Sequence, residues 1–214
     1  MDEATPMFPL GGVLFPGMPL RLRVFEPRYR TMVADCLEGT PEFGVVLIER
    51  GNEVGGGDVR TDVGTVARIV EAGRYDDGRW ALATVGVRRV RVRRWLADEP
   101  YPRAELEDWP QEGDAPSAEE RRTVTGAFRR LLALAAEMGA PGPPATVELA
   151  DEPAVAVYQM AAGAPLGPAD GHVVLGSASL AEQWRRLGEL MVDQAELLEA
   201  RVAMAEGDDG FETP

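Results

Sequence analysis

The sequence predicts an α+β protein with a small β-barrel in its first half and a helical bundle in its second half. Residues 7–109 contain short apolar and alternating segments separated by glycine, which is typical of strands in a small barrel. After Trp109 the apolar residues recur at helical spacing instead. The charge also divides. Residues 1–110 carry 15 arginines against 18 acidic residues, whereas residues 111–214 carry 7 against 18.

Six strands are expected in the first half. Apolar and basic residues alternate over 20–24, which predicts a strand with one face on a core. Residues 43–48 are a continuous apolar run, which suits a strand buried on both sides. Asp77-Gly78 is a hairpin signal, because that turn requires positive φ. The expected strands are 20–24, 43–48, 63–70, 80–85, 87–95 and 103–107.

One helix interrupts these strands at about 27–38. Pro27 presets the first helical φ, apolar residues then recur at helical spacing, and Gly39 ends the pattern. This spacing places Cys36 on the buried face, so we expect a thiol packed in the core rather than a reactive one.

The helical bundle is expected over residues 111–206, with helices at about 118–138, 153–162 and 180–206. Ser117 with Glu120, and Ser179 with Glu182, have the spacing of capping boxes and so mark two helix starts. Residues 207–214 are acidic and are expected to form a flexible tail.

Composition excludes several chemistries. All 22 basic residues are arginine, and the chain has one cysteine and one histidine, His172. The absence of lysine excludes a Walker A loop, a Schiff base and a Ser-Lys dyad. The single cysteine and histidine exclude an internal disulfide and the metal sites that are rich in either residue. No catalytic residue, cofactor or metal is therefore expected.

The compartment is also an expectation from composition. No apolar run approaches the ~18 residues that cross a bilayer. The first six residues, MDEATP, are acidic where a signal peptide would be basic. We therefore expect a cytoplasmic protein without a membrane partner.

Two segments carry a family resemblance: Leu14-Phe15-Pro16-Gly17-Met18 and Phe25-Glu26-Pro27-Arg28-Tyr29-Arg30. At this separation they resemble the substrate-binding domain at the N-terminus of the ATP-dependent Lon protease. The free-standing bacterial proteins that consist of this domain alone are the most similar. The resemblance continues through residues 43–47, 63–67 and 86–92, and more loosely through the last helices. It implies a PUA-like barrel followed by a helical bundle, and a domain that recognises protein substrates.

The functional hypothesis is therefore a non-catalytic module that binds polypeptides. Its partners would be unfolded or specific protein substrates, with a separate protease or chaperone as an associate, and homo-oligomers are compatible with it. An apolar groove or patch between the two halves is the expected mechanism. The candidate polypeptide-binding residues are Phe15, Met18, Phe25, Arg28 and Tyr29. Structural roles compete with this interpretation: core packing for the apolar residues, and an ion pair between Glu26 and Arg28.

An RNA-binding barrel is the alternative hypothesis. Arg89, Arg91 and Arg93 would share one face of a strand and form a stripe that contacts phosphates. The net charge of -14 disfavours nucleic acid as a partner. We favour a solvated face whose arginines pair with acids from the bundle.

Overall fold

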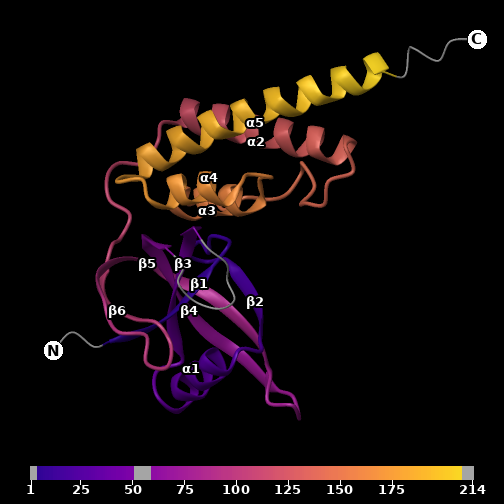
Figure 1. Ribbon diagram of the computed structural model, residues 1–214. Coiled ribbons are helices and arrows are strands. Elements are labelled where there is room, and N and C mark those ends of the chain that lie inside the picture. Colours follow the sequence, from indigo (N-terminus) through magenta and orange to yellow (C-terminus); the bar gives the residue numbers. More distant parts are fainter. Residues whose placement is uncertain (1–3, 51–58, 209–214) are drawn as a thin grey trace, which may run out of the picture. The chain divides into compact units, whose positions relative to one another are not determined.

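The computed structural model describes residues 4–50 and 59–208, which form two compact units: Met1–Gln111 and Glu112–Pro214 (Figure 1). The first unit holds six strands and one helix, and the second holds four helices. Each unit is described by itself below. Among the described residues, no helix has both the length and the apolar character that crossing a membrane requires.

The six strands of the first unit form one sheet that closes on itself. They are β1 (Thr5–Leu10), β2 (Pro19–Val24), β3 (Glu42–Arg50), β4 (Val59–Arg74), β5 (Trp80–Trp95) and β6 (Arg103–Asp108). The strand order is β2-β5-β4-β3-β1-β6, and β6 also pairs with β5. Strands β1, β3, β4, β5 and β6 therefore make a closed barrel, while β2 extends the sheet beside β5. The α+β prediction, with a barrel lobe before a helical lobe, is confirmed.

Strand β5 closes the barrel because it is long enough to pair with two different partners on the same side. Its first half pairs with β2 (Trp80↔Val24) and its second half with β6 (Arg91↔Glu107). The sequence predicted two strands here, divided at Gly86. In the structure the strand runs through Gly86, which exchanges backbone hydrogen bonds with the 15–18 turn. A Cβ at this position would lie 2.4 Å from the carbonyl oxygen of Phe15, so a side chain would not fit.

Helix α1 (Pro27–Glu38) contributes its apolar face to the barrel's core. Proline at its first turn and a C-cap at Gly39 give it the expected limits. Tyr29, Met32, Val33 and Cys36 are buried together with Phe8 and Phe43. The Phe8 and Tyr29 rings stack at 4.3 Å between centroids, which joins β1 to α1.

The second unit comprises α2 (Ala118–Glu137), α3 (Pro153–Gly163), α4 (Pro168–Leu175) and α5 (Leu180–Asp208). Helix α5 packs against the other three. Its contact with α2 is close at Gly188, where a Cβ would lie 3.0 Å from a methyl group of Val124. Two hydrogen bonds also join α5 to α3. Buried Gln183 donates to the Tyr158 hydroxyl (3.2 Å), and Trp184 Nε1 donates to the Pro153 carbonyl oxygen (3.1 Å).

The two predicted helix starts differ in detail. Ser117 and Glu120 form the complete capping box. At the second start, Ser179 Oγ accepts from the Glu182 amide, but the Glu182 carboxylate accepts from the Ala178 amide one residue earlier. The sequence placed His172 in a turn, whereas it lies in α4. The prolines and glycines around this short helix concealed it: Pro168 stands in its first turn, and Gly171 lies inside it.

Candidate functional site

The five residues proposed for polypeptide binding separate into buried and exposed members. Phe15 and Tyr29 are 3% and 2% exposed, and Met18 is half-buried. Tyr29 belongs to the core cluster of the barrel and Met18 packs against that cluster. The structure thus places Phe25, which is 54% exposed, at the surface as the one accessible aromatic ring of this group.

Arg28 is committed to local contacts at the start of α1. Its Nε donates to Glu26 Oε2 at 3.1 Å, and its guanidinium lies 4.5 Å from the centroid of the Tyr29 ring. The charge-assisted pair expected as the structural alternative is therefore present. It links the residue before the helix to the first turn, which orients the buried Tyr29 beneath it.

Phe25 lies near the turn of the β4–β5 hairpin, which projects beyond the rest of the barrel (Figure 1). Strands β2 and β5 pair as far as Val24 and Trp80, and Phe25 is the residue that follows Val24. Across the hairpin, the Tyr75 amide donates to the Arg79 carbonyl oxygen at 2.9 Å. Tyr75 and Arg79 are therefore opposite each other on one face of the hairpin. We call Phe25, Tyr75 and Arg79 the hairpin face.

The hairpin face presents aromatic rings around a cation. Tyr75 is 51% exposed, and the Arg79 guanidinium lies 5.6 Å from the centroid of its ring. Asp77 pairs with Arg79 at 2.7 Å, and backbone and side-chain hydrogen bonds from Arg79 lower the pKa of this carboxyl group. Chemically, the surface offers two aromatic rings, a guanidinium group and a carboxylate at the hairpin turn and the adjoining end of β2. Such a mixture suits contact with a polypeptide.

Sequence reasoning identified the Asp77-Gly78 turn but did not include Tyr75 or Arg79 among the candidate residues. The available signal was the composition of the hairpin itself. Tyr75 and Trp80 flank the turn, and aromatic residues beside an exposed turn are natural contact residues. Phe25 joins them only through strand pairing, which no local pattern shows.

The arginine stripe of β5 is engaged within its own barrel. Arg89 is 3% exposed, and it donates to the carbonyl oxygens of Trp109 (2.8 Å) and Pro110 (3.0 Å). Arg93 forms an ion pair of 3.3 Å with Glu107, and its hydrogen bond lowers the pKa of that carboxyl group. Glu107 belongs to β6, not to the helical bundle, so the acidic partner differs from the expected one. A phosphate group would have to displace these contacts.

The serines that follow His172 in the sequence bond to the backbone. Ser177 Oγ donates to the Val173 carbonyl oxygen, and Ser179 Oγ accepts from a helix amide, so both hydroxyls serve the backbone. Across residues 4–50 and 59–208, no three His, Cys, Asp or Glu side chains lie together in a way that could hold a metal ion.

Comparison with known proteins agrees with this architecture. The family model of the ATP-dependent protease La (LON) substrate-binding domain matches residues 4–193. A Lon N-terminal domain protein from Xanthomonas campestris has a crystal structure with a TM-score of 0.65 and 29% identity, covering 89% of this chain and 98% of that one. The N-terminal domain of a Mycobacterium avium complex Lon protease has a TM-score of 0.60 at 15% identity, covers 89% of this chain and 99% of its own, and supports the fold alone.

Curated relatives are much longer than the matched region. A Lon protease from Desulfosudis oleivorans is 30% identical over 109 residues, which are 47% of this chain and 13% of that protein. A Lon protease from Roseiflexus castenholzii is 27% identical over 205 residues, which are 92% of this chain and 25% of that protein. The chain thus spans a quarter or less of these relatives. With the family model covering most of its length, the chain belongs to the LON substrate-binding domain family.

Proposed function

We propose that this protein is a non-catalytic module that binds unfolded or flexible polypeptide segments through the hairpin face. The observation that carries the proposal is the exposure of Phe25 (54%), at the end of β2, and of Tyr75 (51%), in the projecting hairpin that pairs with β2. Membership of a substrate-binding family supports a binding role over a catalytic one. A separate protease or chaperone in the cytoplasm would then receive the bound chain.

The chemistry of the hairpin face fits an extended segment with apolar side chains. Phe25 follows Val24 and Tyr75 follows Arg74, and both of these residues pair with Trp80, so the two rings are about 10 Å apart at ordinary strand spacing. This separation lets two apolar side chains of an extended peptide contact the two rings at once. The Arg79 guanidinium can donate hydrogen bonds to the carbonyl oxygens of the peptide, and the Asp77 carboxylate can accept them from its amides.

The test is binding of an unfolded model protein, reduced and carboxymethylated lactalbumin, labelled with a fluorophore and followed by anisotropy. Its acidic character makes electrostatic attraction to a chain of net charge -14 unfavourable, so binding would report apolar contact. The variant is the double substitution Phe25→Ser and Tyr75→Ser. The control is Leu197→Ser with Val173→Ser, which removes two side chains of similar exposure from the helical unit.

We expect the hairpin variant to bind roughly tenfold more weakly, since it loses two apolar contacts, and the control to bind within about twofold of the native chain. Absence of binding by the native chain would refute the proposal. Equal loss in the two variants would refute the assignment of the surface.

A further inference from the structure

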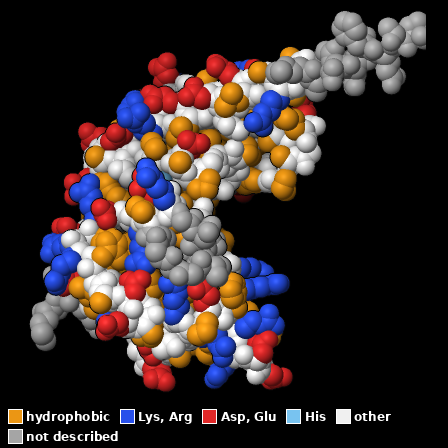
Figure 2. Space-filling model, in the orientation of Figure 1, with side chains coloured by type: hydrophobic (Ala, Val, Ile, Leu, Met, Phe, Trp, Pro, Cys, Tyr) orange, Lys and Arg blue, Asp and Glu red, His pale blue; other side chains and the backbone are white. Residues whose placement is uncertain are grey.

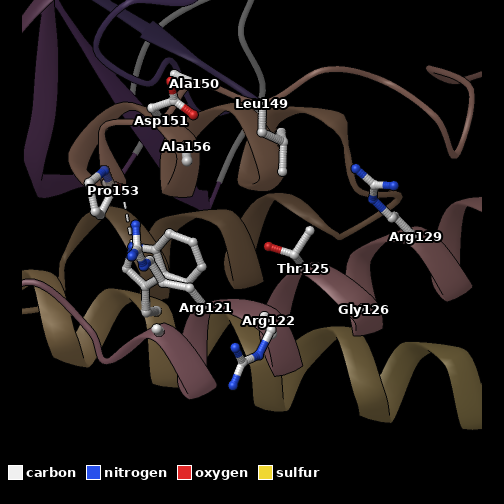
Figure 3. A pocket seen from close by; sticks show the side chains of 12 residues that line it. Arg121, Arg122, Thr125, Gly126, Arg129, Leu149, Ala150, Asp151, Pro153 and Ala156 are labelled. Atoms are coloured by element: carbon white, nitrogen blue, oxygen red, sulfur yellow. Dashed lines mark hydrogen bonds between the residues drawn. The ribbon is translucent and has the colours of Figure 1, made fainter.

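The helical unit contains a cavity of about 530 Å³ that is lined by an unusual number of arginines. One wall is a single face of α2, and the other is the 149–156 segment that leads into α3 (Figure 3). Arg121, Arg122 and Arg129 line it, and a separation of seven or eight residues, about two helical turns, keeps Arg129 on the same side of α2 as the other two. A volume of this size is typical of a small-molecule site.

Three of the other four arginines in the helical unit have acidic partners. Arg130 pairs with Glu199, and Arg185 and Arg186 pair with glutamates of α5. By contrast, Arg121, Arg122 and Arg129 form no ion pair or side-chain hydrogen bond with any residue of the described chain. The Nε atom of Arg121 is buried and has no hydrogen-bond partner among the described residues. In a unit with 18 acidic residues against 7 arginines, unpaired cations around one cavity indicate a place for an anion.

The rest of the lining suits an anion that also has an apolar part. Thr125 adds a hydroxyl group, and Figure 3 shows Thr125 and Arg129 pointing from α2 towards the side on which Leu149 lies. Leu149, Pro153 and Trp184 supply apolar surface. Gly126 leaves the floor open, because a Cβ there would meet no atom within 4 Å.

The charge of the lining indicates the charge of the ligand. Three arginines and one acidic residue, Asp151, line the cavity. Guanidinium groups bind the oxygens of phosphates and carboxylates in pairs, with geometry that other cations do not match. A ligand with two negative charges would balance the excess.

We propose that this cavity is a binding site for a small oxyanion ligand, a phosphate ester or a polycarboxylate, with Arg121, Arg122 and Arg129 as its recognition residues. The site lies wholly within the helical unit, so it is independent of the hairpin face. It gives the protein a small-molecule ligand in addition to a polypeptide.

The test uses the full chain and two probes, pyrophosphate for phosphates and citrate for polycarboxylates, measured by isothermal titration calorimetry at 0.15 M salt. The variant is Arg122→Gln with Arg129→Gln; both side chains are exposed, so the fold should tolerate the change. The matched control is Arg130→Gln with Arg201→Gln, which removes the same charge from α2 and α5 outside the cavity. Amide chemical-shift changes locate the probe.

We expect saturable binding of one probe at least, a loss of roughly tenfold or more in the cavity variant, and less than about twofold in the control. Shifts should concentrate in α2 and the 149–156 segment. The probe that binds more tightly identifies the ligand as phosphate or carboxylate. Absence of saturable binding by both probes, or equal losses in the two variants, would overturn the proposal.

Discussion

The guanidinium of Arg91 lies 3.4 Å from the centroid of the Trp109 ring, and that of Arg89 lies 4.0 Å from it. The Trp109 amide also donates to the Arg89 carbonyl oxygen at 2.9 Å, which continues the pairing of β5 with β6. One indole ring at the end of the barrel therefore holds two arginines that would otherwise repel each other.

Replacing Trp109 with alanine should destabilise the protein by about 2 kcal/mol, because two cation–π contacts are lost around a nearly buried arginine. Urea unfolding at neutral pH measures the change. Tyr75→Ala is the control, since it removes a single cation–π contact at an exposed site, and it should cost under about 1 kcal/mol. Equal effects of the two substitutions would contradict the structural role of Trp109.

Glu42 should make stability depend on pH. Burial opposes ionisation of this carboxyl group, but hydrogen bonds from Arg88 and Arg68 outweigh it and lower the pKa below the ordinary value of 4.5. A lowered folded-state pKa contributes stability above pH 4.5 that is lost as the pH falls through the folded value.

We therefore expect Glu42→Gln to reduce the free energy of unfolding by about 1 kcal/mol at pH 7, a small value because both arginines are partly exposed. The difference from the native chain should shrink as the pH falls below 4.5. Glu38→Gln, an exposed substitution on α1, is the control. A difference that persists unchanged to pH 3 would rule out the linkage.

Cys36 should be unreactive while the protein is folded. The thiol is 2% exposed and lies 3.4 Å from the Glu42 carbonyl oxygen. Burial, together with the charge of Asp35, raises its pKa to about 12, so thiolate is scarce at pH 8.

Reaction with a chromogenic disulfide reagent at pH 8 should be roughly 100-fold slower than that of a free thiol. The same chain in concentrated guanidinium chloride should react at the ordinary rate, which supplies the control. Fast labelling of the folded protein would show that the buried environment of Cys36 opens readily.

Gly64 should not tolerate a side chain. A Cβ at Gly64 would lie 2.2 Å from the carbonyl oxygen of Val45, a backbone atom of the paired strand β3 that cannot move aside cheaply. We expect Gly64→Ala to destabilise the protein by about 2–3 kcal/mol. Gly73, in the same strand, is the matched control: its Cβ would meet nothing within 4 Å, so Gly73→Ala should change stability by under about 1 kcal/mol. Thermal or urea unfolding compares the two.

Much of the fold follows from short local patterns that can be recognised in the sequence. Pro27 and Gly39 limit α1, and Ser117 with Glu120 starts α2, because the groups that cap a helix stand within four residues of its ends. Two short segments around Phe15 and Arg28 also indicated the family. Phe15 and Tyr29 in these segments are buried, so these two side chains serve packing and are not part of an exposed binding surface.

The sequence by itself determined the change from strands to helices, the ends of the main helices and the chemistries excluded by its missing lysine. Only the tertiary structure decided which exposed residues act together. Tyr75 meets Arg79 across the β4–β5 hairpin, Arg91 meets Trp109 where β5 and β6 pair, and Arg129 and Leu149 line one cavity. Spacing along a chain predicts which face a residue occupies, but the partner across that face comes from pairing and packing between distant segments.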